Sequence, residues 1–353
     1  MSDARDASGI EGDLAGSPEL YPHQIDLRGD RVLLLRLTRQ DYSEASFLDQ
    51  RLLDDRRARA WYSWDRIRSG LEAGPAGAAP HYLFHVGHCG STLISRLLDE
   101  LGALPLREPL PLRTLAELHA RIDARDCPWP RPVFDERLSL MLRMLARGRM
   151  PKAVKPSSFC NDLAPAILAQ DAATRATIVY ATPRAYVANL LAGPNSRRDL
   201  EALTAMRSMR LAARIGAPAA DPGGLTPGIA AALNWAAEMT ALSDLAGSAA
   251  GARVLALDFD RFLGDVHGQL RVLAAHAMPD VPAERVAAVS ASATLTRYSK
   301  APEYPYDTAL RQRVRADAEH HWGAEIRAGL AWLEGAARRH RAIERAVSRF
   351  QGA

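Results

Sequence analysis

Short apolar runs alternate with amphipathic stretches through the middle of the chain. Runs at 82–86, 153–154, 176–180 and 254–257 are typical of buried strands. Each run precedes a stretch in which apolar residues recur at helical spacing; between Ser91 and Gly102 they are Leu93, Ile94, Leu97, Leu98 and Leu101. Strands that alternate with helices predict an α/β fold, a three-layer sandwich with a central parallel sheet.

Two further regions flank this alternating pattern. The run 31–37 predicts a strand, and apolar positions between 42 and 71 recur at roughly helical spacing. Gly and Pro between 74 and 80 interrupt the pattern, so we expect a domain boundary there. The predicted organisation is a disordered leader over 1–20, an N-terminal appendage over 21–79 and a main domain over 80–353. In the main domain, 216–228 predicts a mobile loop, and the chain beyond Asp307 predicts helix.

Composition supports a folded chain in a reducing compartment. The 353 residues are 48% hydrophobic, which excludes general disorder and supplies a core. Three cysteines are too few for a disulfide framework. The chain has no run of about 18 apolar residues and starts with polar residues, so we expect no membrane span and no secretory signal. These features predict a cytoplasmic protein.

Charge is nearly balanced, with 45 Lys plus Arg against 41 Asp plus Glu. Residues 310–353 contain nine arginines and five acids and so account for the whole excess. Because the remainder lacks a concentrated basic face with aromatic partners, we expect no nucleic-acid partner. The terminal helix is predicted to present its arginines to solvent over an apolar stripe. Neither pair of neighbouring histidines has further ligands, so no metal is expected.

The segment 85–94 joins a predicted strand to a predicted helix through a turn with Gly87 and Gly90. Backbone N–H groups at a helix start attract anions, and Ser91 and Thr92 add hydroxyl donors. The turn is therefore a candidate phosphate site, or alternatively an ordinary strand–turn–helix whose glycines serve packing. No lysine occurs between Gly87 and Leu101, which argues against a magnesium-dependent phosphotransferase.

The segment 84–98 resembles the 5′-phosphosulfate-binding loop of sulfotransferases, P-[RK]-S-G-[ST]-[ST]-x-L. Gly87 falls on the proline, His88 on the basic residue and Cys89 on the serine, and Gly90, Ser91 and Thr92 follow. Segments 254–263 and 298–306 are similar to later parts of the family, in its bacterial branch. The resemblance implies transfer of a sulfuryl group from 3′-phosphoadenosine 5′-phosphosulfate, without metal, to a hydroxyl or amine of a small molecule or peptide.

Three residues are candidates for catalysis through this resemblance. His88 replaces a permanent cation of the family, and a nearby phosphate would favour its charged form. Lys155 resembles the lysine of the family's second segment, where it would neutralise the leaving oxygen. Ser157 stands where other members have a histidine base, so Glu108 is the expected base. The structural alternatives are a solvated Lys155 and a Glu108 paired with neighbouring Arg107 or Arg113.

The family's contacts to the 3′-phosphate are only partly matched. Alignment puts Ala181 at the family's arginine and Asn189 at its serine. Arg184 is the expected substitute, and Ser299 and Lys300 resemble the late nucleotide-binding segment; each could equally be a surface residue. Trp235 is expected in the core.

Three alternative functions stay open. The chain could be a nucleotide- or partner-binding protein on the same fold, an ATP-dependent phosphotransferase, or an interaction module built on the terminal helix. The acceptor contacts are expected in loops 103–150 and 193–230.

Overall fold

A five-stranded parallel sheet forms the centre of the molecule in a computed structural model that describes residues 14, 16–54, 57–220, 224–299, 305 and 307–352. The strand order is β5-β6-β4-β7-β8, and every neighbouring pair is parallel. The strands are β4 (His81–His85), β5 (Leu104–Arg107), β6 (Lys152–Lys155), β7 (Arg175–Tyr180) and β8 (Val254–Asp258). The predicted α/β fold with a central parallel sheet is therefore confirmed.

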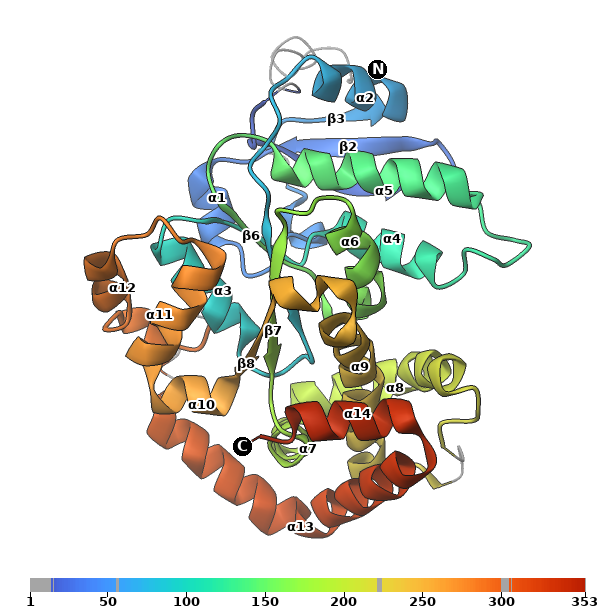
Figure 1. Ribbon diagram of the computed structural model, residues 1–353, viewed down its shortest axis with the longest axis vertical. Helices are drawn as coiled ribbons and strands as arrows, with labels where there is room; N and C mark the ends of the chain where they lie inside the picture. Colours follow the sequence, from blue (N-terminus) through green and yellow to red (C-terminus); the bar gives the residue numbers. More distant parts are fainter. Residues whose placement is uncertain are drawn as a thin grey trace.

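Helices cover both faces of this sheet (Figure 1). One side carries α3 (Ser91–Glu100), α10 (Phe259–Gly264), α11 (Val266–Ala277) and α12 (Ala283–Val289). The other side carries α4 (Leu110–His119), α6 (Ala164–Ala169) and α9 (Pro227–Gly247), with the 3₁₀ turn η3 (Ser158–Leu163) after β6. Because both faces are covered, β4 is buried along its whole length, which explains its unbroken apolar run.

The N-terminal region forms a second sheet of three antiparallel strands in the order β1-β2-β3. They are β1 (Leu20–Asp26), β2 (Arg31–Arg36) and β3 (Arg59–Ser63), and β2 confirms the predicted strand. The helix expected between 42 and 71 is wrong: α1 (Arg39–Glu44), η2 (Gln50–Leu52), β3 and α2 (Trp64–Glu72) occupy that region. Pairing of β3 with β2, with Trp61 opposite Leu33, overrides the helical spacing.

The buried guanidinium of Arg107 joins β5 of the large sheet to α1, the helix that follows β2 of the N-terminal sheet. It donates hydrogen bonds to the carbonyls of Tyr42, Ser43 and Ala45, at 3.2, 3.0 and 2.8 Å, and burial lowers its pKa to about 10. The backbone N–H of Leu48 donates to the Arg107 carbonyl at 2.7 Å. The segment after α1 is thereby fixed beside the carboxyl end of β5.

Helices close the carboxyl edge of the large sheet. They are α7 (Pro183–Ala192), α8 (Pro194–Ile215), α13 (Thr308–Arg339) and α14 (Arg341–Phe350), while α5 (Arg131–Ala146) lies against the N-terminal sheet (Figure 1). The helical C-terminal region is confirmed, with a break at His340. Trp235 on α9 is fully buried, as expected for the core. Most of the expected leader, and residues 221–223 of the expected loop, lie outside the described residues.

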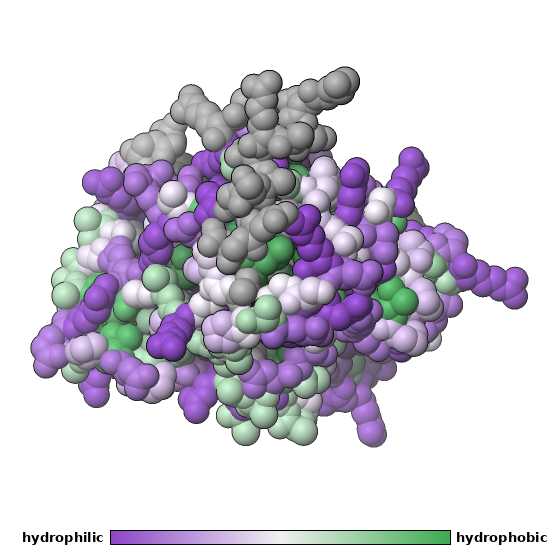
Figure 2. Space-filling model, turned by 90° about the horizontal axis from the view of Figure 1, so that it is seen from above, coloured by the Kyte–Doolittle hydropathy of each residue, from purple (hydrophilic) through white to green (hydrophobic). Residues whose placement is uncertain are grey.

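In the part of the chain that the structure describes, no helix combines the length and apolar character needed to cross a membrane. Seen from the end that carries the N-terminal sheet, the surface is mainly hydrophilic, with scattered hydrophobic residues (Figure 2).

Candidate active site

The turn between β4 and α3, residues 86–90, has the backbone geometry of an anion cradle, and we call it the phosphate turn after the ligand that the sequence predicts there. Gly87, His88 and Gly90 all have positive φ angles, 85°, 47° and 79°, so the chain winds tightly before α3 begins at Ser91. A Cβ atom on Gly90 would lie 2.0 Å from the ring of Phe259, so glycine is required there on two grounds. The N–H groups of Ser91 and Thr92 have no acceptor within the helix, whereas that of Leu93 donates to the Gly90 carbonyl at 2.9 Å. The helix dipole adds positive potential. The predicted strand–turn–helix is present, with its backbone suited to an anion.

The side chains of Cys89, Ser91 and Thr92 offer fewer contacts to a bound anion than the sequence suggests. The Cys89 thiol donates to the Val179 carbonyl at 3.2 Å, and burial raises its pKa to about 11. Ser91 and Thr92 are also buried. The contacts that these three residues could offer a bound phosphate are therefore mainly those of the backbone.

The side chain of His88 lies against the start of α8. Its Nε2 is 3.4 Å from a carboxylate oxygen of Asp199, and its Nδ1 is 3.4 Å from the hydroxyl of Ser196. The imidazole is thus held beside the turn by polar groups of a different helix.

Lys155 and Glu108 form an ion pair at the ends of the neighbouring strands β6 and β5. Lys155 Nζ lies 2.5 Å from Glu108 Oε1, and the Glu108 N–H donates to the Lys155 carbonyl at 2.6 Å. Glu108 adopts a positive φ of 53°, an unfavourable conformation for this residue type. The Lys155 side chain is 1% exposed and that of Glu108 28%. The carboxylate therefore reaches solvent while the ammonium lies behind it.

Both structural alternatives for this pair differ from what is observed. Lys155 is buried, not solvated. Arg107 pairs with Asp99 at 3.1 Å, and Arg113 pairs with Glu117 at 3.1 Å. The turn follows β4, which pairs with β6, so Lys155 and the turn lie at the same end of the sheet.

A second carboxylate, Glu238 on α9, is completely buried behind the turn. It accepts hydrogen bonds from Arg207 at 2.9 Å, from Arg210 at 3.1 and 3.3 Å, and from the Asn161 amide at 2.9 Å. Burial lowers the pKa of Arg210, but the charges of Glu238 and Asp162 outweigh burial and raise it overall. We call Glu238, Arg207, Arg210 and Asn161 the Glu238 cluster.

The Glu238 cluster reaches the phosphate turn through Ser158. Arg207 donates to the Ser158 hydroxyl at 3.0 Å, and that oxygen is 3.7 Å from where a Cβ atom would stand on Gly87. Arg207 also lies over the ring of Phe159, 5.3 Å from its centroid. The cluster therefore supports the turn from behind.

Two arginines of α13 approach the turn from the other side. Arg311 and Arg315 donate to the two carboxylate oxygens of Asp260 at 2.8 and 2.7 Å. Burial raises the pKa of Asp260, but the hydrogen bonds from Arg315 and Arg311 outweigh it and lower the pKa overall. Arg315 also donates to the Asn189 side-chain oxygen at 3.3 Å, and the Asn189 amide donates to the His88 carbonyl at 3.5 Å. Two guanidinium groups that share one carboxylate therefore lie near the turn.

The remaining predicted nucleotide residues are placed differently. Arg184 is 59% exposed, and its guanidinium pairs with Glu319 at 2.8 Å. The Ser299 carbonyl accepts a hydrogen bond from Arg96 at 2.7 Å. Lys300 lies outside the described residues.

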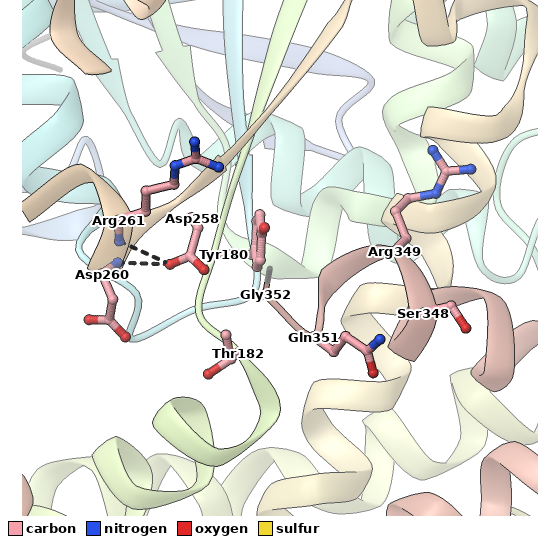
Figure 3. Close-up of a pocket in the computed structure, with 9 residues that line it drawn as sticks. All are labelled: Tyr180, Thr182, Asp258, Asp260, Arg261, Ser348, Arg349, Gln351 and Gly352. Carbon is pink, nitrogen blue, oxygen red and sulfur yellow. Dashed lines mark hydrogen bonds between the residues drawn. The ribbon is translucent and has the colours of Figure 1, made fainter. Parts of the chain in front are cut away.

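A cavity of about 800 Å³ lies at the carboxyl ends of β7 and β8, within the size range of small-molecule sites. In Figure 3 the side chain of Asp258 points toward the backbone of Asp260 and Arg261, whose N–H groups donate to it at 2.8 and 3.4 Å. Asp260, which binds the α13 arginines, also lines the cavity, so the cavity adjoins the phosphate turn. The lining is completed by Tyr180, Thr182, Arg261, Ser348, Arg349, Gln351 and Gly352.

No protein-family model matches the chain, and no curated protein sequence matches it either. Among solved structures, the chain is similar to the sulfotransferase domain from the curacin biosynthetic pathway, with 12% identity and a TM-score of 0.37 over 70% of this chain and 99% of that one. The sulfotransferase domain of the Synechococcus PCC 7002 olefin synthase is similar at 14% identity and a TM-score of 0.37, over 70% and 95%.

A third similar structure is the sulfotransferase STF9 from Mycobacterium avium, with 12% identity and a TM-score of 0.35 over 91% of this chain and 97% of that one. Identities and TM-scores are low throughout. The function of this chain therefore has to be inferred from its own residues.

Several residues at the site were not found from the sequence. Arg311 and Arg315 are four apart at the start of the terminal helix, a spacing that puts both on one face, and this was the available signal. The expectation that the arginines of this helix are solvated is wrong for Arg311, which is buried. Arg207 and Glu238 carry no local signal, because their pairing depends on how α8 packs on α9.

Proposed function

We propose that this chain is a sulfotransferase that moves a sulfuryl group from 3′-phosphoadenosine 5′-phosphosulfate to a hydroxyl or amine acceptor. The observation that carries the proposal is the Lys155–Glu108 pair at the end of β6, the strand that pairs with β4, after which the glycine turn follows. An anion cradle, a buried cation and a solvent-reaching carboxylate are the groups that transfer from a phosphosulfate requires.

The Lys155–Glu108 pair suggests how the two residues act together. Glu108 takes the proton of the acceptor hydroxyl as the acceptor oxygen forms its bond to sulfur and the bond between sulfur and the phosphate oxygen breaks. Protonation removes the negative charge that holds the Lys155 ammonium. Because this ammonium is buried, it then turns to the negative charge that develops on the leaving phosphate oxygen. His88 adds a second cation at the turn when it is protonated.

We assign the 3′-phosphate and the nucleoside of the donor to the edge of the sheet beside β7. The 3′-phosphate is assigned to Arg311 and Arg315, two guanidinium groups that share the Asp260 carboxylate, in place of the arginine that is absent at Ala181. Asn189 lies between them and the turn. The adjoining cavity is large enough for the nucleoside. Arg184, Ser299 and Lys300 stay predictions as further contacts, and the free cysteines agree with the proposed cytoplasmic location.

Calorimetric titration with adenosine 3′,5′-bisphosphate tests the proposal, followed by transfer of labelled sulfuryl from the donor to a panel of alcohols, phenols, sugars, peptides and amines. Binding and a labelled product are expected. Binding with no product across the panel would favour a nucleotide-binding protein. Thermal stabilisation by ATP with magnesium, but not by the bisphosphate, would favour a phosphotransferase.

A further inference from the structure

His85, the last residue of β4, connects the two halves of the site. The Gly87 N–H donates to His85 Nδ1 at 3.0 Å, and His85 Nε2 is 3.0 Å from the carbonyl oxygen of Pro156. Gly87 begins the phosphate turn, and Pro156 directly follows Lys155. A single buried ring therefore touches both the anion cradle and the strand end that carries the ammonium.

The partners of His85 determine its tautomer. A backbone N–H can only donate, so Nδ1 must carry a lone pair. A carbonyl oxygen can only accept, so Nε2 must carry the proton. The ring is therefore the neutral Nε2–H tautomer, and no other protonation state satisfies both neighbours.

The backbone of His85 is fixed as well. The Asn161 amide donates to the His85 carbonyl at 3.0 Å and to Glu238 at 2.9 Å. The position of the ring is thus set by the Glu238 cluster, which is itself anchored between α8 and α9. This arrangement leaves the imidazole little freedom to exchange its partners.

We propose that His85 is a positioning residue that sets the phosphate turn and Lys155 in register with each other. The effect of His85 on turnover rests on the proposed function, whereas the hydrogen bonds of the His85 ring can be tested independently of that function. Each ring nitrogen serves one half of the site: Nδ1 holds the turn for the nucleotide, and Nε2 holds Pro156 and thereby the ammonium of Lys155.

Two amide substitutions separate these roles. In His85→Asn the side-chain oxygen takes the place of Nδ1 and keeps the bond from Gly87, but the contact with Pro156 is lost. In His85→Gln the longer amide takes the place of Nε2 and keeps Pro156, but Gly87 loses its acceptor. Leaving a buried polar group without its hydrogen-bond partner changes an affinity or a rate roughly tenfold. We therefore expect His85→Asn to lower kcat about tenfold with unchanged bisphosphate affinity, and His85→Gln to weaken that affinity about tenfold with kcat nearly unchanged.

His81 provides the matched control, because it is a buried histidine on the same strand whose Nε2 contacts the Thr177 hydroxyl at 2.9 Å, away from the turn. His81→Asn and His81→Gln should lower the melting temperature while leaving both affinity and kcat unchanged. Equal losses of affinity and of kcat in both His85 variants would overturn the proposal and indicate a purely structural residue.

Nuclear magnetic resonance decides the inference separately from the proposed function. Nitrogen shifts of the wild-type ring should show the Nε2–H tautomer, and the Gly87 amide should exchange faster in His85→Gln than in His85→Asn. An Nδ1–H tautomer, or equal Gly87 exchange in the two variants, overturns the role of His85 whether or not the variants are active. A wild-type protein that binds no bisphosphate, but shows this tautomer and exchange pattern, overturns the proposed function and retains the positioning role.

Discussion

Two carboxylates at the same edge of the sheet, Glu108 and Glu238, have opposite surroundings. Glu238 is fully buried and receives hydrogen bonds from two arginines and an amide. Glu108 reaches solvent and pairs with Lys155, on a backbone in an unfavourable conformation. A carboxylate saturated with donors serves the fold, because it cannot accept a proton without leaving buried cations unpaired. In the proposed function, Glu108 is the carboxylate that takes a proton from a ligand, since it reaches solvent.

The largest effect is expected from Glu238→Ala. Removal of this carboxylate leaves Arg207 and Arg210 without their shared partner, and breaking a buried pair typically costs about 3–5 kcal/mol in the free energy of unfolding. Urea denaturation followed by circular dichroism measures the loss, with the exposed Glu201→Gln of α8 as the control. A loss no larger than that of Glu201→Gln would show that Glu238 does not stabilise the fold.

Glu108→Gln should act mainly on turnover. The amide cannot take a proton, so kcat for sulfuryl transfer should fall by about 10²–10⁴-fold. The urea midpoint should fall as well, because the buried Lys155 ammonium loses its carboxylate, but by less than in Glu238→Ala, since only one cation is left without its partner. Glu117→Gln, on the neighbouring helix, is the matched control for an exposed glutamate paired with an arginine. Turnover unaffected by Glu108→Gln would exclude this residue as the base.

Lys155→Ala should lower kcat by about 100-fold, because the leaving oxygen loses its neutralising charge. The other lysine of β6, Lys152, gives the control: it is buried at the amino end of the strand and donates to the Gly148 carbonyl at 2.5 Å. Lys152→Met should keep kcat. Equal turnover losses in the two variants would show that any buried lysine of β6 matters only for folding.

The smallest effect concerns pH and stability. Burial lowers the pKa of His81 to about 3 and that of His23 to about 4, from an ordinary value of 6.5. Between the lowered pKa values and 6.5, the unfolded chain binds more protons than the folded chain. The contribution of these histidines to the free energy of unfolding is therefore fully present above pH 6.5 and is lost as the pH falls toward 4. Urea midpoints at pH 7 and pH 5 measure this slope, and His81→Asn should flatten it. An identical slope in that variant would exclude His81 as a contributor.

The sequence predicts the features that depend on neighbours along the chain. The runs at 82–86, 176–180 and 254–257 are found as strands, and the glycines of the turn have the positive φ angles that their residue type permits. The edge strand β5 was not predicted, because it is only four residues long and contains Pro105. The pairing of Lys155 with Glu108 depends on β5 lying beside β6, a contact between residues 47 positions apart. The Glu238 cluster has the same origin, in the packing of α8 on α9.

The guanidinium of Arg107 has a consequence for how the molecule melts. Its acceptors in residues 42–45 belong to the N-terminal sheet region, whereas its backbone belongs to the central one. If the first 73 residues were removed, the guanidinium would lose those three carbonyls and the residues that cover it, and Ser95 and Asp99 would remain as its partners. Heating should therefore unfold both regions in one cooperative transition, and cleavage between 74 and 80 should not release an independently stable fragment.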